Sequence, residues 1–225
     1  MPPSTPIDQH VLILGAGPGL GASIARRFGR EGFAVTLVGR REAALNELAG
    51  ELRGAGVAVN TATADAADPR GFRTALDGLA EHITPGVVVY NAAVVAADSI
   101  LTTDEEYLLS TYAVDVLGAI SAAQVFTRAM RQAEAGTFLA TGGDLGVDPQ
   151  PAHASLSLGK AALRAAVSLL HDELKGDGVH VAGVTIFGEI AADTPFAPDR
   201  IAETYWALHT QPAADWSAEA VFDGR

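Results

Sequence analysis

The chain has 225 residues, of which 48% are apolar, and this suffices for a single α/β domain with a complete core. Cysteine is absent, which excludes a disulfide framework and a thiolate metal site and suits a reducing cytoplasm, where we expect the protein to reside. The formal net charge of −12 disfavours binding to nucleic acid or to an anionic membrane surface, because both carry dense negative charge.

The start of the chain, residues 1–9, is rich in proline and lacks a basic segment. We therefore expect a short flexible lead-in there and not a signal peptide. No apolar run is expected to be long enough to cross a bilayer. Residues 10–225 then form the predicted domain, with a short segment on the substrate side at about 190–210.

Segments typical of strands and of helices alternate along the chain, which is the pattern of parallel βαβ units. The predicted strands are Val11–Leu14, Phe33–Val38, Val57–Thr61, Val87–Tyr90, Thr137–Ala140, Val179–Ile186 and Ala220–Asp223. The predicted helices cover about 20–30, 41–53, 69–82, 103–132, 153–175 and 199–209. Right-handed crossovers would wind these elements into a doubly wound parallel sheet, a Rossmann fold, with ligand-binding loops at the carboxyl ends of the strands.

A glycine-rich turn lies between the first strand and the first helix. Gly15 allows a sharp exit from the strand, Gly19 lets the backbone approach a pyrophosphate, and Gly21 lets the helix pack closely. The free N–H groups at the helix N-terminus would then face the phosphates. We expect a dinucleotide to bind along this turn, which also contains Gly17 and Leu20.

The long helix predicted over 103–132 has a recognisable start. Thr103 followed by Glu106 forms a capping box, and Leu109, Tyr112 and Val116 then recur at helical spacing. This helix and the helix that carries Lys160 have more apolar positions than one sheet face can bury. We therefore expect a homodimer or a homotetramer.

Five motif positions, taken in order, resemble the short-chain dehydrogenase/reductase family over about residues 10–223. They are the glycines of the turn, Asp65 after the third strand, Asn91-Ala92-Ala93 after the fourth, Lys160, and Phe187-Gly188-Glu189-Ile190 after the sixth. The resemblance implies that Asp65 hydrogen-bonds the adenine and that Lys160 holds the nicotinamide ribose. The residues expected to bind the cofactor are Gly15, Gly17, Gly19, Leu20, Gly21, Arg40, Arg41, Asp65, Asn91, Ala92, Ala93, Lys160, Gly188 and Ile190.

The sequence departs from the family at its proton-transfer group, which is a tetrad of Asn, Ser, Tyr and Lys. Asp115 stands in the Asn position, Gly143 in the Ser position and Leu156 in the Tyr position. Lys160 is the one member that is kept, although Thr141 lies two residues from the Ser position and could supply a hydroxyl. The resemblance thus implies that a cofactor contact is kept, while the tyrosine whose pKa the lysine would lower is missing.

The end of the second strand favours NADP(H) over NAD(H). An acid there would hold the ribose 2′-hydroxyl of NAD, whereas Arg40 and Arg41 offer guanidinium groups that suit the extra phosphate of NADP. The alternative is that both arginines begin a solvated helix and pair with Glu42.

Without the tyrosine, another group must protonate the product or no proton is required. His153, Ser157 and Lys160 would share one stripe of a continuous helix, and Ser155 lies nearby. The alternative for His153 is a loop position bonded to backbone. Asp115, Asp144 and Glu189 are further carboxylates on this side, each with an ordinary structural alternative. The catalytic candidates are Lys160, His153, Ser157 and Asp115.

Three classes of function remain open at this point. The first is an NADP(H)-dependent oxidoreductase with non-standard proton handling, which reduces for example an iminium or a conjugated acceptor. The second is a non-redox enzyme, and the third is a catalytically silent cofactor-binding sensor or partner; the fold alone cannot choose among them. Leu156 and Gly143 widen the site and make it less polar, which suits a small apolar or aromatic substrate. Ala191–Pro198 would be a short lid.

Overall fold

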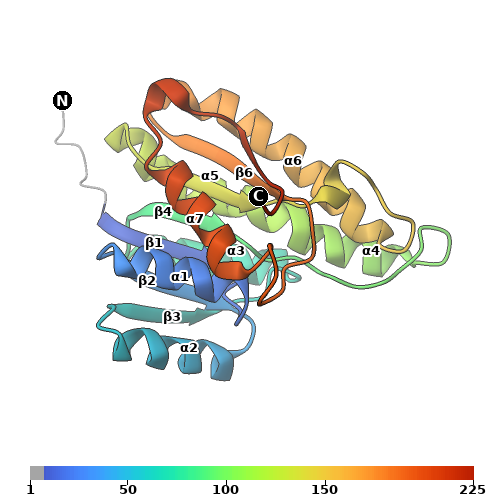
Figure 1. Cartoon of the computed structure of the whole chain (residues 1–225), viewed down its shortest axis with the longest axis horizontal. Helices are drawn as coiled ribbons and strands as arrows, with labels where there is room; N and C mark the ends of the chain where they lie inside the picture. The colour runs from blue at the N-terminus through green and yellow to red at the C-terminus, as the bar shows by residue number, and fades with distance from the viewer. Residues whose placement is uncertain (1–7) are drawn as a thin grey trace.

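The computed structural model describes residues 8–225, and its centre is a sheet of seven parallel strands. The strand order is β3-β2-β1-β4-β5-β6-β7, so the direction of winding reverses between β1 and β4 (Figure 1). The strands are β1 (Asp8–Leu14), β2 (Ala34–Gly39), β3 (Val59–Thr63), β4 (Pro85–Tyr90), β5 (Thr137–Thr141), β6 (His180–Ile186) and β7 (Glu219–Phe222). The predicted fold class is confirmed: this is a single-domain, doubly wound Rossmann fold.

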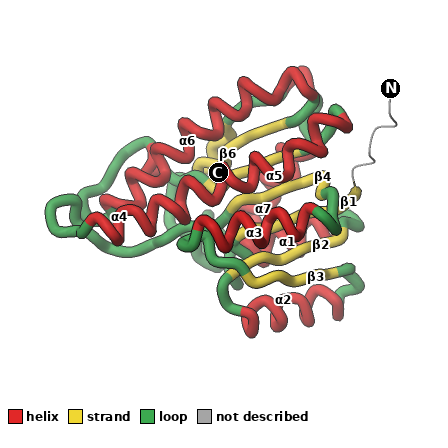
Figure 2. Tube along the Cα trace, turned by 180° about the vertical axis from the view of Figure 1, so that it is seen from behind, coloured by secondary structure: helices red, strands yellow, loops and turns green. Residues whose placement is uncertain are grey.

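Helices cover both faces of the sheet, as the two opposite views in Figures 1 and 2 show. One face carries α1 (Leu20–Arg30), α2 (Glu42–Gly54) and α7 (Pro198–His209). The other face carries α3 (Pro69–Ala80), α5 (Gly118–Ala133) and α6 (Ala154–Leu174), with α4 (Glu105–Tyr112) leading into α5. Short helical turns lie at Ala113–Leu117, Asp144–Gly146, Lys175–Asp177 and Ala213–Asp215.

The central strands are buried along their whole length and are mostly apolar, because helices pack on both of their faces. Every residue of β4, β5 and β6 is buried. Side chains that alternate along the strands therefore enter two separate cores. The carboxyl ends of these rigid strands all lie at one edge of the sheet, where α4 and the start of α6 project beyond it (Figure 2).

The predicted helix over 103–132 is interrupted. A π-helical turn, Ala113–Leu117, separates α4 from α5, and its Val114 carbonyl accepts a hydrogen bond from the buried Tyr90 hydroxyl. A Cβ on Gly118 would collide with that hydroxyl, so this glycine makes room for the tyrosine. Helical periodicity in a sequence does not reveal such a turn, which inserts one residue without changing the residue types.

The predicted start of this helix is also wrong by one residue. The side chain of Asp104 caps α4 by accepting from the Tyr107 N–H at 2.8 Å, whereas the Thr103 hydroxyl donates to the Ser99 carbonyl oxygen. An aspartate is as good an N-cap as a threonine, so the sequence alone could not decide whether Thr103 or Asp104 caps the helix. Leu109, the first of the apolar positions that recur at helical spacing, is 71% exposed.

The other boundaries differ by at most two residues, except that β1 starts three residues before the predicted Val11; the third strand starts two residues later than predicted. Most of the predicted lead-in, residues 1–7, lies outside the described residues. Its last two residues belong to β1, which starts at Asp8.

One expectation about membranes needs correction. The helical stretch Glu105–Ala133, which includes the π-helical turn, is long and apolar enough to cross a membrane by length and composition alone. About half of its most apolar window, 56%, is buried inside the fold, where α5 packs against the sheet and α3. Core packing accounts for these apolar residues, so the helix is weak support for a membrane span.

Candidate active site

Two clefts open at the carboxyl edge of the sheet, on either side of the point where the winding reverses. The first, of about 250 Å³, is lined by the glycine turn, the end of β2 and the segment after β3. The second, of about 800 Å³, is lined by the ends of β5 and β6 and the start of α6. Asn91 and Ala93 line both, so the two clefts meet after β4 and form one groove. Ligands of doubly wound sheets bind at this place.

The glycine turn is fixed by the loop that follows β4. Gly15 has φ +94°, and a Cβ there would lie 2.4 Å from the Ala92 nitrogen, so both conformation and space require glycine. The Asn91 Nδ2 group donates to the Gly15 carbonyl oxygen at 2.9 Å. Beyond the turn, α1 begins at Leu20, and Gly17 and Gly19 have open space around them. The predicted phosphate cradle therefore has the required backbone.

Arg40, Arg41 and Asp65 line the first cleft, as the sequence analysis expected. Both arginines are exposed, and within residues 8–225 neither guanidinium forms an ion pair with Glu42 or with another carboxylate. One oxygen of Asp65 accepts from the Ala67 N–H at 3.0 Å. The guanidinium groups are thus available to an anionic ligand.

A chain of hydrogen bonds through Thr141 links Lys160, Asn91 and Tyr205 at the centre of the groove. The buried Lys160 ammonium donates to the Thr141 carbonyl oxygen at 2.7 Å, and the Thr141 hydroxyl donates to Asn91 Oδ1 at 2.8 Å. The Tyr205 hydroxyl, on α7, lies 2.6 Å from the Thr141 hydroxyl and donates to it, because the threonine proton is already used. Burial lowers the pKa of Lys160, and the Asp115 carboxyl acts in the opposite direction.

Asp115 lies in the π-helical turn behind Lys160. Its Oδ1 accepts from the Val94 N–H at 2.9 Å, which ties the turn to the loop after β4. Its Oδ2 is buried and has no hydrogen-bond partner, and a Cβ on Gly159 would lie only 2.7 Å from this atom. Burial raises the pKa of Asp115 to about 6, although the Val94 hydrogen bond and the Lys160 charge oppose that shift.

Gly143 and Leu156, which the sequence analysis matched to the family's Ser and Tyr positions, have no side-chain hydrogen-bond donor. Leu156 and Gly143 both line the larger cleft, with Leu156 one helical turn before Lys160 on α6. The wall where a hydroxyl pair would stand is therefore apolar.

His153 and Ser157 are arranged differently from the predicted stripe. His153 is the residue before α6, with φ −138° and ψ 53°, and its Nδ1 lies 2.9 Å from the Ala96 carbonyl oxygen. The Ser157 hydroxyl donates to the His153 carbonyl oxygen at 2.8 Å and accepts from the Gln150 N–H. His153 lines the larger cleft, whereas Ser157 is buried and holds the start of the helix.

The segment after β6 forms the outer wall of the larger cleft. Gly188, Glu189 and Ile190 line it, and a Cβ on Gly188 would lie 2.5 Å from the ring of Phe196. Phe196 in turn contacts Phe222 of β7 edge to face. The short predicted lid is thus attached to the edge strand.

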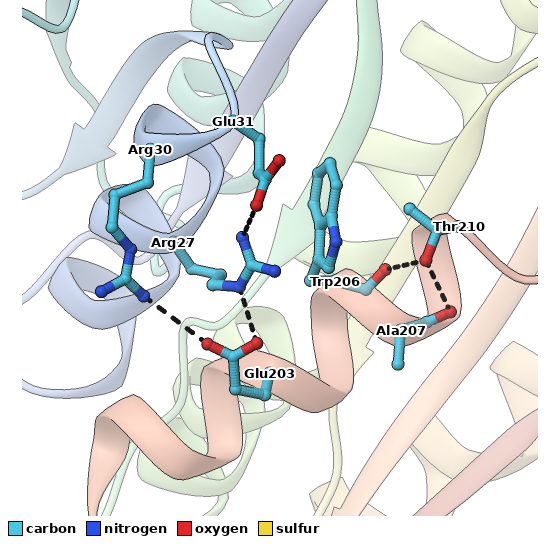
Figure 3. A network of polar contacts seen from close by, with 7 residues as sticks. All are labelled: Arg27, Arg30, Glu31, Glu203, Trp206, Ala207 and Thr210. Carbon is cyan, nitrogen blue, oxygen red and sulfur yellow. Dashed lines mark hydrogen bonds and ion pairs between the residues drawn. The ribbon is translucent and has the colours of Figure 1, made fainter.

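Helices α1 and α7 are joined by the polar network of Figure 3. The Arg27 guanidinium binds Glu31 at 2.5 Å and Glu203 at 2.7 Å and lies 4.7 Å from the centre of the Trp206 ring. Arg30 also reaches Glu203, at 3.5 Å. The helix that starts at the glycine turn is therefore tied to the helix that follows the lid.

Sequence reasoning missed Tyr205, Val94 and Gly159. Tyr205 was expected on a helix, but nothing in its spacing showed a contact with Thr141, which is 64 positions away. Thr141 was noted from the sequence only as a source of a hydroxyl. Its position at the end of β5, at the edge where ligands bind, was the signal that could have indicated a role in the site.

The fold and this groove define a dinucleotide-binding oxidoreductase scaffold, and the comparisons with known proteins agree. The sequence profile of the short chain dehydrogenase family matches residues 9–195, so the chain belongs to that family. It is 27% identical over 213 residues to 7beta-hydroxysteroid dehydrogenase of Collinsella aerofaciens, covering 92% of this chain and 81% of that protein. It is 30% identical over 184 residues to sulfoacetaldehyde reductase 2 of Chromohalobacter salexigens, covering 79% and 71%.

A solved structure of a short-chain oxidoreductase is also similar to this chain. A metagenomic short-chain oxidoreductase in complex with NADP superposes with a TM-score of 0.86 at 26% identity, covering 96% of this chain and 97% of the other. Members of this family use a nicotinamide dinucleotide, and the groove fits one. The glycine cradle at Gly15 and the unpaired guanidinium groups of Arg40 and Arg41 are the observations that support this fit.

Proposed function

We propose that the protein is an NADP(H)-dependent oxidoreductase that does not use the family's tyrosine to transfer a proton. The single observation that carries the proposal is the position of Leu156. It lines the cleft one helical turn before Lys160, next to a groove that keeps the elements needed for a dinucleotide. An idle site has no physical need for the glycine cradle, the two arginines and a buried lysine together.

The proposed cofactor contacts follow from the groove. The N–H groups of the turn Gly15–Gly21 bind the diphosphate, Arg40 and Arg41 bind the 2′-phosphate, and Asp65 binds the adenine. Asn91, Ala92 and Ala93 would contact the dinucleotide, and Lys160 would hold its ribose hydroxyls. Gly188 and Ile190 contact the nicotinamide. When bound, the reduced cofactor supplies a hydride.

The chain's own residues then orient the reaction without a dedicated acid. Thr141 holds Lys160 through its carbonyl oxygen and Asn91 through its hydroxyl, so one residue aligns both contacts. Leu156 and Gly143 leave room for an apolar or aromatic substrate and offer it no proton. Any proton that is needed comes from solvent, because Asp115 is buried and is not among the residues that line the larger cleft. His153, another catalytic candidate, lines the same cleft.

NADP(H) is the proposed cofactor in preference to NAD(H). Arg40 and Arg41 have no carboxylate partner among residues 8–225, and no acid ends β2, which is Ala34–Gly39. The metagenomic relative of known structure was crystallised with NADP. We further place the protein in the cytoplasm, which the lack of cysteine suits, and we expect no nucleic-acid or membrane partner.

Two measurements on the unaltered protein test this function. Calorimetry compares the binding of NADPH and NADP⁺ with that of NADH and NAD⁺, and stopped-flow absorbance follows NADPH oxidation with ketones, enones and iminium ions. We expect preferential NADPH binding and oxidation with at least one class of acceptor. Tight binding with no oxidation by any acceptor would favour the cofactor-binding sensor or partner. Absence of dinucleotide binding would overturn the proposal.

A further inference from the structure

The substrate half of the larger cleft is walled by apolar side chains. They are Val95, Leu145, Leu156, Ile186 and Ile190. Val95 is 77% exposed, so it presents apolar surface at the mouth. Such a wall favours a ligand whose body is a ring or another apolar group.

The Thr141 hydroxyl and the His153 ring of this wall already make hydrogen bonds within the protein. The Thr141 hydroxyl donates to Asn91 Oδ1 and accepts from Tyr205. His153 must carry a proton on Nδ1, because the Ala96 carbonyl oxygen can only accept. A reacting oxygen that gains negative charge would find no tyrosine hydroxyl at this wall, and the Lys160 ammonium is the group proposed to bind the ribose hydroxyls of the cofactor.

The charged groups of the cleft are arranged for a cation. Asp144 and Glu189 both line it, and within residues 8–225 neither carboxylate is part of an ion pair. Asp144 Oδ1 accepts the Leu145 N–H, which leaves the other oxygen for a ligand. Lys160 is the cation of this lining, and it is buried against Thr141. The side open to a substrate is therefore negative, and opposite charge attracts over this range.

These features select among hydride acceptors by their chemistry. A ketone that receives a hydride becomes an alkoxide and needs a proton, for which a positioned acid contributes about 10²–10⁴ in rate. An iminium carbon that receives a hydride forms a C–H bond, the C=N π pair becomes the nitrogen lone pair, and a neutral amine results. The reduced dinucleotide is oxidised in the same step, and no proton enters.

We propose that the substrate is a cationic C=N compound, an iminium ion on an apolar or aromatic ring, attracted by Asp144 and Glu189. This inference rests on the proposed NADP(H)-dependent function and names its substrate class. The cationic nitrogen lies toward the two carboxylates, and the ring lies along Leu156 and Val95.

A binding measurement distinguishes recognition of the positive charge from simple affinity for an apolar ring. The protein is loaded with tetrahydro-NADP, a reduced analogue that cannot transfer a hydride. Calorimetry then compares an N-methyl dihydroisoquinolinium ion with the methyl dihydronaphthalene of the same shape, which has carbon in place of the charged nitrogen. We expect the cation to bind about tenfold more tightly than the neutral hydrocarbon. Equal affinities would overturn the inference.

Variants that remove one negative charge each test whether Asp144 and Glu189 cause the preference for the cation. Asp144→Asn and Glu189→Gln should each weaken cation binding about two- to fivefold and leave binding of the hydrocarbon unchanged, as expected for partly exposed charge pairs. Glu47→Gln is the matched control, because this exposed residue of α2 carries the same charge and does not line either cleft. A control effect equal to that of Glu189→Gln would mean that only net charge matters and would overturn the assignment to these residues.

Stopped-flow kinetics with NADPH keep this inference distinct from the proposed function. We expect the N-methyl iminium to be reduced faster than a ketone of the same ring size, because hydride addition to the iminium carbon needs no proton. Reduction of enones or ketones in preference to the iminium would overturn the inference and leave the NADP(H)-dependent function standing. NADPH binding without oxidation by any acceptor would overturn both.

Discussion

The Lys160 ammonium is held 2.7 Å from the Thr141 carbonyl oxygen, at the end of β5. This contact fixes the lysine in the groove without the tyrosine that accompanies it elsewhere in the family. A buried ammonium needs such an acceptor, because desolvation penalises its charge. The fold itself therefore holds this lysine in the lining of the groove.

Replacing Lys160 with Ala should weaken NADPH binding about tenfold to a hundredfold, which is the range for lost hydrogen bonds from a charged group. Fluorescence titration with NADPH measures this change. The chain offers a matched control in Lys175→Ala, because Lys175 lies on the surface and pairs with Asp172. Unchanged NADPH affinity in a folded Lys160→Ala variant would show that the lysine does not contact the cofactor.

Replacing Arg40 with Ala should remove most of the preference for NADPH over NADH. Charge-assisted hydrogen bonds to the 2′-phosphate are worth about 1.5–3 kcal/mol, and NADH makes none of them. Calorimetric titration with both dinucleotides gives the preference directly. Arg128→Ala on α5 removes an equal charge away from the groove and should leave the ratio unchanged. Equal affinity of the unaltered protein for NADPH and NADH would refute the assignment.

Asp115→Asn should change how stability depends on pH. Burial raises the folded pKa of this carboxyl to about 6, above its unfolded value, so its contribution is fully present below about pH 4 and is lost as the pH rises through 6. A shift of about two units corresponds to about 2–3 kcal/mol. The amide keeps the acceptor for the Val94 N–H. Urea unfolding at several pH values should therefore show the variant gaining stability relative to the parent between pH 4 and 7. A difference that is constant with pH would contradict this.

The oligomer is expected to pair through α4 and α6. Leu109 and Leu169 are each 71% exposed on these helices, and a groove lined by Ile120, Ala166 and Leu170 runs between α5 and α6. Leu109→Glu together with Leu169→Glu should convert a dimer or tetramer into smaller species in light scattering at micromolar concentration. Val221→Glu, on the outer strand β7, tests the other exposed edge. A strict monomer before any change would refute the expectation.

Much of the fold could be predicted from the sequence, because apolar runs such as Val87–Tyr90 are short, buried and bounded by turn residues. The glycine turn was predictable for the same reason, since Gly15 is required by its backbone conformation. These signals are local along the chain. The end of β2, with Arg40 and no acid, is a local signal as well.

The rest of the site depends on contacts between distant segments. Thr141 meets Tyr205 and Asn91 across the sheet, and no spacing in the sequence indicates those pairs. The π-helical turn that directs Asp115 toward Val94 likewise has no periodic signature, because one inserted residue is absorbed by a helix of ordinary composition.

His153 shows the same limit in another way. Spacing along an ideal helix placed it in line with Lys160, but α6 begins one residue later, at Ala154. Its carbonyl oxygen accepts from Ser157 and its ring bonds Ala96. Replacing His153 with Ala therefore tests the substitute-acid hypothesis separately from the lysine.

The central claim is that this family member works without the positioned acid, and ketone reduction tests it most directly. Single-turnover stopped-flow experiments with NADPH and a cyclic ketone compare the unaltered protein with a variant carrying Leu156→Tyr and Gly143→Ser. We predict slow reduction by the unaltered protein and a measurable gain in the variant, within the range of about 10²–10⁴ that a positioned acid supplies. Rapid ketone reduction by the unaltered protein, with no gain in the variant, would contradict the account, because another acid would then already be in place.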